Sequence, residues 1–312
     1  MKYMNSKKII LIITILSFNF LNYNLLSQEK PSICFTFDDG NPKDILEYEN
    51  DNWNKMILDQ LAERDLQAVL FVCGRNLDNE DGKMILESWN DAGHIIANHT
   101  YSHLNYNNPK NDFEKFRDDI LKCDSLINGY KNFQKYFRFP MLKGGETREK
   151  RDSINAFLQR TGYKNGYVTI DNSDWFINSR MIKFMEENPD SSIEKYKKYY
   201  IEHLIDRAKY YDDIAYKLLG RRVKHTLLMH HNLTSALFLN DLMDAFKKEG
   251  WELIDADKAF TDPIFEMIPD IFPAGESIIW SLAKASGKFE DKLRYPAEDS
   301  PYEEGRMNQL GL

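Results

Sequence analysis

Residues 32–40 read Ser-Ile-Cys-Phe-Thr-Phe-Asp-Asp-Gly, an apolar run that ends in two adjacent carboxylates and a glycine. A short apolar run of this kind predicts a buried strand, which we expect over residues 33–37. In a regular strand Asp38 and Asp39 would face opposite sides, so they share a site only if the chain turns there. Gly40 permits such a turn. The stretch therefore predicts a core strand with acidic groups at its carboxyl end.

The remainder of the chain alternates strand and helix patterns. Further strands are predicted over residues 68–73, 94–97, 136–139, 166–170, 226–230 and 251–254. Helical spacing of apolar residues lies between them, over residues 53–62, 83–92, 113–127, 154–160 and 236–248. Strands that are apolar throughout and alternate with helices predict a parallel sheet with helices outside it. An open sheet and a closed barrel both fit this pattern.

The positions of the polar residues favour the barrel. The aspartate pair, His99, Arg138, Asp171 and His230 each lie at or just after the end of a predicted strand. Such residues converge if the sheet closes, because barrel active sites are built at that face. We therefore predict an α/β fold, a distorted (β/α)7 barrel, irregular because it has seven strands rather than eight.

Two stretches are additional to the elements that a minimal barrel requires. Residues 180–222 form a helical insertion, either a lid or a packing element, and residues 262–312 form a C-terminal extension with one helix over 277–285. Neither has the composition of a linker. We expect one barrel domain over residues 28–261 that contains the insertion, with the extension packed on it.

The N-terminus has the pattern of an export signal. Three lysines within the first eight residues precede an apolar run over residues 9–18, and a weak cleavage site precedes Gln28. The run is short for a membrane span. We expect residues 1–27 to be a signal peptide and the protein to be exported, periplasmic or secreted. An uncleaved signal would act as a membrane anchor.

The net charge bears on nucleic-acid binding, and the cysteines bear on disulfides and metal sites. The chain has 312 residues and a formal net charge of −8, which argues against a nucleic-acid partner. Of the three cysteines, Cys34 and Cys73 lie in predicted buried strands, and Cys123 is the third. We expect core packing rather than a disulfide or a cysteine metal site.

Two histidines supply the remaining ligands for a metal. His99 and His103 are four residues apart and would lie on one face of a helical turn. Two histidines and one carboxylate form a three-ligand catalytic zinc site that keeps a position open for water. The second carboxylate is then available as a general base, which predicts a metal-dependent hydrolase. The alternatives are a turn formed by the aspartates and a solvent-facing histidine pair.

Other strand-end residues have two interpretations each. Arg138 either holds a carboxylate in its ionised form or is a surface charge. Trp175 either forms an apolar wall for a substrate or fills the core. His230 and His231 face opposite sides of a strand, so one of them enters the site, and His230 is favoured.

Five motifs together resemble the polysaccharide deacetylase family, also called the NodB-homology domain or family-four carbohydrate esterases. They are Thr-Phe-Asp-Asp-Gly (36–40), Asn-His-Thr-Tyr-Ser-His (98–103), Arg-Phe-Pro (138–140), Asp-Asn-Ser-Asp-Trp (171–175) and Leu-Met-His (228–230). They occur in the family's order within residues 31–257. The resemblance implies the family's distorted (β/α) barrel.

The resemblance also implies a metal centre and a base. Asp39, His99 and His103 would bind one divalent ion, Zn2+ in the first place, with Co2+ or Ni2+ as alternatives. Asp38 would be the general base and Arg138 would steady it.

The other implied roles concern the acid and the substrate. His230 would be the general acid, tuned by Asp171. Trp175 would line the acetyl pocket together with Pro140 and Met141, whose N–H would hold the oxyanion. The family usually has an aromatic residue where Met141 stands, so one pocket wall differs here.

The activity implied is removal of N-acetyl groups from a sugar polymer or oligosaccharide, with release of acetate. Hydrolysis of an O-acetyl ester or of another small amide needs the same groups and remains an alternative. A non-catalytic glycan-binding protein is a third possibility, and it would be expected to lack a ligand or the base.

Overall fold

The computed structural model describes residues 30–312, so the expected signal peptide lies outside the described residues. Its main sheet is parallel, with strand order β6-β4-β3-β2-β1-β7, and β8 pairs with the beginning of β1. The strands are β1 (Ser32–Asp39), β2 (Val69–Val72), β3 (Ile95–Asn98), β4 (Phe133–Phe137), β6 (Lys164–Asn165), β7 (Lys224–His230) and β8 (Glu252–Leu253). Six of these seven strands overlap the strands expected from the sequence.

The sheet curls into a distorted barrel, and residues 164–170 connect its two edges. Gly166 donates its N–H to the Phe137 carbonyl of β4 (2.7 Å), which holds the beginning of this segment. Ile170 accepts the N–H of Leu228 in β7 (3.0 Å), which holds its end. The strand predicted over 166–170 is therefore replaced by β6 and a single bridge from Ile170 to Leu227. The barrel prediction is confirmed, and this segment is its most irregular part.

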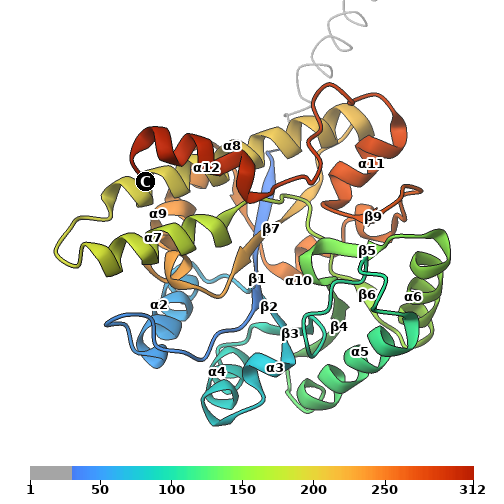
Figure 1. Ribbon diagram of the computed structural model, residues 1–312, viewed down its shortest axis with the longest axis horizontal. Coiled ribbons are helices and arrows are strands. Elements are labelled where there is room, and N and C mark those ends of the chain that lie inside the picture. Colours follow the sequence, from blue (N-terminus) through green and yellow to red (C-terminus); the bar gives the residue numbers. More distant parts are fainter. Residues whose placement is uncertain (1–29) are drawn as a thin grey trace, which may run out of the picture. The chain divides into compact units, whose positions relative to one another are not determined.

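Helices surround the curled sheet, and Figure 1 shows β1 and β7 side by side at its centre. The helices that alternate with strands are α2 (Asn50–Ala62), α4 (Glu80–Asp91), α5 (Phe113–Ile127), α6 (Arg148–Arg160) and α9 (Leu233–Lys248). Shorter pieces are α3 (Gly74–Leu77), α10 (Ala256–Ala259), η1 (Pro140–Leu142) and η2 (Pro263–Glu266). Most helices begin before the predicted apolar stripe, because polar N-caps such as Asn79 and Asn232 start them earlier.

The expected insertion is a helical hairpin of α7 (Asp174–Glu187) and α8 (Glu194–Leu219). It begins at Asp174, six residues before the predicted start. Helix α8 packs on α9 and α11 and buries an aromatic and aliphatic face that includes Tyr200 and Tyr211. Of the two roles considered for the insertion, packing therefore accounts for α8.

The extension contains α11 (Ile278–Ser286), as predicted, and a further helix, α12 (Ser300–Leu310), which the sequence reasoning missed. It also contains β9 (Ala274–Gly275), which pairs antiparallel with β5 (Lys143–Gly145). Figure 1 shows α8, α11 and α12 gathered on one side of the sheet.

The cysteines test one further expectation. Cys34, Cys73 and Cys123 are all buried and free, so the prediction of core packing without a disulfide is confirmed. Within residues 30–312, no helix combines the length and apolarity needed to cross a membrane.

Candidate metal and catalytic site

The predicted site residues meet at the carboxyl ends of the strands. Asp38 on β1 is in register with His230 on β7. On the other side of β1, Asp39 is in register with Val72, which pairs in turn with Asn98. His99 follows directly after Asn98, so neighbouring strands deliver one carboxylate and one histidine to the same place.

A left-handed turn allows both aspartates to face this place. Asp39 has φ 77° and Gly40 has φ 79°, so the strand ends in two residues of left-handed conformation. A side chain at position 40 would also collide with Leu77, since a Cβ there would lie 2.5 Å from its Cδ1. The turn expected from Gly40 is therefore present, and Asp39 adopts a conformation that costs roughly 1–3 kcal/mol.

Three ligand atoms converge in the way a metal ion requires. Asp39 Oδ1 lies 3.6 Å from His99 Nε2 and 3.3 Å from His103 Nε2. A tetrahedral zinc with bonds of about 2.0–2.1 Å places its ligand atoms about 3.4 Å apart. Asp39 Oδ1 is also buried without any hydrogen-bond partner, which is unfavourable for a carboxylate oxygen unless a cation neutralises it. These residues fit a divalent ion.

The surroundings of His99 select its metal-binding tautomer. Its Nδ1 lies 2.9 Å from the Arg138 carbonyl, which can only accept, so the proton is on Nδ1 and the Nε2 lone pair faces Asp39. Burial, then the neighbouring His103, lowers the pKa of His99 well below its usual range. The neutral imidazole is the form that binds a metal.

The path of the chain between the two histidines differs from our expectation. No helical turn forms there, because Thr100 (φ 63°) and His103 (φ 55°) have left-handed conformations. Side chains hold this irregular turn instead: Asn98 accepts the Thr100 N–H, and Thr100 Oγ1 accepts the His103 N–H. The two rings still meet, with centroids 5.0 Å apart.

Asp38 lies beside the three candidate ligands, with its Oδ2 3.6 Å from His99 Nε2, and is held by Arg138. Arg138 Nη1 donates to its Oδ1 at 2.5 Å and to Thr36 Oγ1 at 2.8 Å, and Arg138 Nε donates to the Gly166 carbonyl at 2.8 Å. Burial raises the pKa of Asp38 to about 6, although Arg138 and His230 favour its charged form. The guanidinium, buried over the Phe71 ring, thus forms an ion pair with Asp38.

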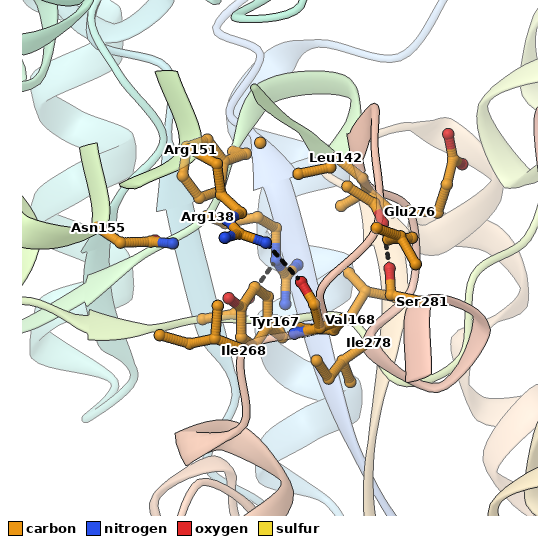
Figure 2. A pocket seen from close by; sticks show the side chains of 17 residues that line it. Arg138, Leu142, Arg151, Asn155, Tyr167, Val168, Ile268, Glu276, Ile278 and Ser281 are labelled. Carbon is orange, nitrogen blue, oxygen red and sulfur yellow. Dashed lines mark hydrogen bonds between the residues drawn. The ribbon is translucent and has the colours of Figure 1, made fainter. Parts of the chain in front are cut away.

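The far side of Arg138 borders a second, mostly apolar cavity of about 40 Å³ (Figure 2). Tyr167, Val168 and Ile278 are among its walls, and Arg151 reaches it from α6. Arg151 donates to the Pro269 carbonyl and to Asp270, so its charge is paired on the extension. Asp38 is the carboxylate that forms an ion pair with Arg138.

His230 has a different partner from the one we expected. Its Nδ1 lies 2.7 Å from Asp174 Oδ1, and its backbone N–H donates to Asp174 Oδ2 at 2.8 Å. Burial disfavours a charged imidazole, but Asp174, then Asp39 and Asp38, outweigh it and raise the pKa of His230 to about 10. The structure therefore pairs His230 with Asp174, and the expected pairing with Asp171 is wrong.

Helix α7 explains this correction. It begins at Asp174, and this first residue lies against the end of β7, where Asn232 also donates to it (3.2 Å). Asp171 instead lines a hollow with Glu276 and Glu298, and burial, then these two carboxylates, raise its pKa well above the usual range. The sequence signal was the second aspartate of the Asp-x-x-Asp group, which directly precedes a helical stretch.

The three residues expected to contact the substrate differ in exposure. Trp175 is 39% exposed and lines the hollow beside the metal ligands. Met141 is 52% exposed, has φ 54° and lines the same hollow, whereas Pro140 is buried and is not among its walls. Trp175 and Met141 can thus contact a ligand, and Pro140 serves the turn.

His231 points away from the site, as strand alternation predicted. Its Nδ1 accepts the Asn41 N–H (3.0 Å), its Nε2 lies 2.9 Å from Asn54 Oδ1, and its ring packs on Trp53. Burial lowers the pKa of His231 to about 3. His231 is therefore a neutral core residue.

Sequence comparison finds relatives of known description. A family model described as polysaccharide deacetylase matches residues 26–165, somewhat less than half of the chain. The peptidoglycan-N-acetylglucosamine deacetylase of Bacillus cereus is 31% identical over 99 residues, which are 32% of this chain and 32% of that protein. The chain is also 24% identical to the peptidoglycan-N-acetylmuramic acid deacetylase PdaA of Bacillus subtilis over 249 residues, 78% of this chain and 75% of PdaA.

Solved structures share the fold. A peptidoglycan N-acetylglucosamine deacetylase matches 75% of this chain and 89% of its own, with TM-score 0.51 and 20% identity. A mutant of a CE4-family pseudoenzyme matches 74% of this chain and 67% of its own, with TM-score 0.51 and 16% identity. At these identities the similarity establishes the architecture alone.

Proposed function

We propose that this chain, which matches the polysaccharide deacetylase family model over residues 26–165, is a metal-dependent hydrolase that removes N-acetyl groups from a glycan and releases acetate. Both curated relatives are named as peptidoglycan deacetylases, so peptidoglycan is the first substrate to test. An exported enzyme, as the N-terminal pattern indicates, would have access to such a polymer.

The observation that carries this proposal is the convergence of Asp39, His99 and His103 on one point, with the buried Asp39 Oδ1 otherwise unpartnered. Asp38 and His230, in register on adjacent strands, stand beside that point. We propose Zn2+ as the ion, because two imidazoles and one carboxylate suit it.

A divalent cation at this site would polarise the acyl carbonyl and make water more acidic. Asp38, held by Arg138, accepts a proton from the attacking water. We assign the stabilisation of the developing oxyanion to the Met141 N–H, which follows Pro140 in the turn.

Breakdown of the tetrahedral adduct needs an acid. An amine is a poor leaving group, so the C–N bond breaks only as nitrogen gains a proton. His230 supplies that proton from Nε2, while its Nδ1–H remains on Asp174. Acetate and a free amino sugar result.

The rival functions make different demands on the site. A non-catalytic glycan-binding protein would be expected to have lost a ligand or the base, and this chain retains all of them. An O-acetyl ester needs no strong acid, because an alkoxide leaves more readily than an amide nitrogen. The Asp174–His230 pair keeps a protonated imidazole available and therefore favours amide cleavage.

The test combines metal content with acetate release. The zinc-supplemented protein is expected to hold about one ion and to release acetate from one of peptidoglycan, chitin oligomers, xylan or acetylated exopolysaccharide. Asp39→Ala is expected to abolish both. A protein that binds no stoichiometric ion, or an Asp39→Ala variant that retains the metal, would contradict the proposal.

A further inference from the structure

A second hollow, which we call the donor groove, adjoins the metal site on the side of β1 and β2. It has a volume of about 510 Å³, and its walls include Lys43, Arg75, Asn41 and Asn178. Asp39, Trp175 and His230 line both this groove and the hollow of about 530 Å³ on the other side. A polymer lying across the metal site would therefore occupy both.

The two hollows differ in charge. Asp39 is the one acidic side chain among the described residues that line the donor groove, and it is a metal ligand in our proposal. The opposite hollow is lined by the carboxylates of Asp171, Glu276, Glu298 and Asp299, with Lys143 paired to Glu276. In a chain of net charge −8, the donor groove is thus a local cationic region.

Lys43 and Arg75, the two cations of the donor groove, have exposed side chains. Within residues 30–312, neither the Lys43 nor the Arg75 side chain makes a hydrogen bond or an ion pair. Their backbones are nevertheless anchored. Trp53 Nε1 donates to the Lys43 carbonyl (3.1 Å), and the Arg75 N–H donates to the Tyr101 carbonyl (2.7 Å). Asn76 Nδ2 ties the Arg75 helix to the turn after β1 through the Gly40 carbonyl (3.0 Å).

The amide groups of the groove add further donors. The Asn41 side-chain oxygen accepts the Lys43 N–H, and the Asn178 side-chain oxygen accepts the Thr234 N–H. Both oxygens are thus engaged, and the amide NH2 groups remain available. An ammonium, a guanidinium and two amide NH2 groups form a lining of donors, which suits an acceptor-rich anion such as a carboxylate.

We infer that the donor groove selects an acidic glycan, and that Lys43 and Arg75 bind a carboxylate on the sugar beside the one being deacetylated. The inference rests on the proposed function and adds a substrate class to it. Arg75 can grip a carboxylate with two parallel hydrogen bonds, whereas Lys43 contributes a mobile point charge.

A pair of matched substrates tests this selection. One is a peptide-free oligomer of alternating N-acetylglucosamine and N-acetylmuramic acid, and the other is the same oligomer with its muramic carboxylates converted to amides. The zinc-loaded wild type is expected to have about a fivefold higher kcat/KM for acetate release from the acidic oligomer at low salt. That ratio should approach one in 0.5 M salt.

Variants locate the effect in the groove. The double variant Lys43→Gln/Arg75→Gln is expected to lose most of the preference for the acidic oligomer. The double variant Lys43→Gln/Arg75→Lys, which keeps a positive charge at position 75, should regain part of it. The matched control is Lys247→Gln with Lys248→Gln. It removes the same charge at the exposed far end of α9, about 24 Å along the helix from its start near the site.

The outcomes separate the two proposals. Equal kcat/KM for the two oligomers, or an unchanged ratio in the double groove variant, would overturn the inference and leave the deacetylase proposal standing. Release of acetate from no substrate would contradict the deacetylase proposal instead. Calorimetric binding of the two oligomers to the zinc-loaded protein then tests the groove without turnover, and equal affinities would overturn the inference.

Discussion

At the scale of single residues, the adjacent Asp38 and Asp39 have different surroundings, which suit them to different chemical roles. The Asp38 carboxylate is almost fully buried and bonded to Arg138, whereas the Asp39 side chain is 33% exposed and its Oδ1 lacks a hydrogen-bond partner. The left-handed turn at Asp39 creates the difference, because it rotates the second carboxylate towards the histidines.

Asp38→Asn should separate metal binding from catalysis. The amide keeps the size of the side chain but cannot accept the water proton, so acetate release is expected to fall by about 10²–10⁴-fold. Asp39, His99 and His103 remain, and about one metal ion should still be found by elemental analysis. Unchanged turnover would exclude Asp38 as the base.

The pH dependence of activity reports the base and the acid. Asp38 must be ionised, so activity is lost as pH falls through its pKa of about 6. His230 must be protonated, so activity is lost as pH rises through its pKa of about 10. A bound cation favours the charged form of Asp38 and disfavours that of His230, so it moves both limbs to lower pH.

Asp174→Asn should move the alkaline limb of this profile to lower pH, because it removes the charge that keeps His230 protonated. The acid limb should move little, and kcat at neutral pH should fall. Asp171→Asn is the comparison, since Asp171 makes no hydrogen bond or ion pair with His230. An equal displacement of the alkaline limb by both variants would contradict the assignment to Asp174.

At the scale of elements, α8 supports the loop that carries the acid's partner. His203 Nε2 accepts the Ser173 N–H (3.0 Å), directly before Asp174, and its Nδ1 lies 3.3 Å from Glu303 of α12. The insertion and the extension are therefore joined to the loop before Asp174 through one buried imidazole. The strand and helix patterns of the sequence do not predict this connection.

His203→Ala should destabilise the protein and weaken catalysis together. It leaves a buried N–H without a partner and opens a cavity, so the free energy of unfolding is expected to fall by about 2–4 kcal/mol. Urea unfolding measures this change. Lys198→Ala, on an exposed position of α8, should stay within about 0.5 kcal/mol. Equal stability of the two variants would show that the connection is unimportant.

At the scale of the whole molecule, the extension is part of the same core as the barrel. Met307 of α12 is completely buried, and the core that contains it also includes Phe37 of β1 and Leu239 of α9. Arg180 of α7 also donates to the carbonyl of the last residue, Leu312. We therefore expect residues 31–312 to unfold as one unit.

Met307→Ala tests this continuity. Loss of a buried methionine side chain should lower the free energy of unfolding by about 2–5 kcal/mol, and a single urea transition should shift as a whole. Leu310→Ala, at a half-exposed position of the same helix, should cost much less. A separate early transition in Met307→Ala would show instead that α12 unfolds independently of the barrel.

The sequence by itself determined the parallel α/β architecture, the positions of six of its seven main strands within a few residues, and the gathering of an aspartate of the 38–39 pair with His99 and His103. These follow from local order, because apolar runs form buried strands and polar residues at their ends share one face. Only the tertiary structure decided that Asp174 rather than Asp171 holds His230, that an irregular turn carries the histidines, and that α12 completes the core. Each of these depends on contacts between residues far apart in the chain, where strand register and the starting points of helices select the partner.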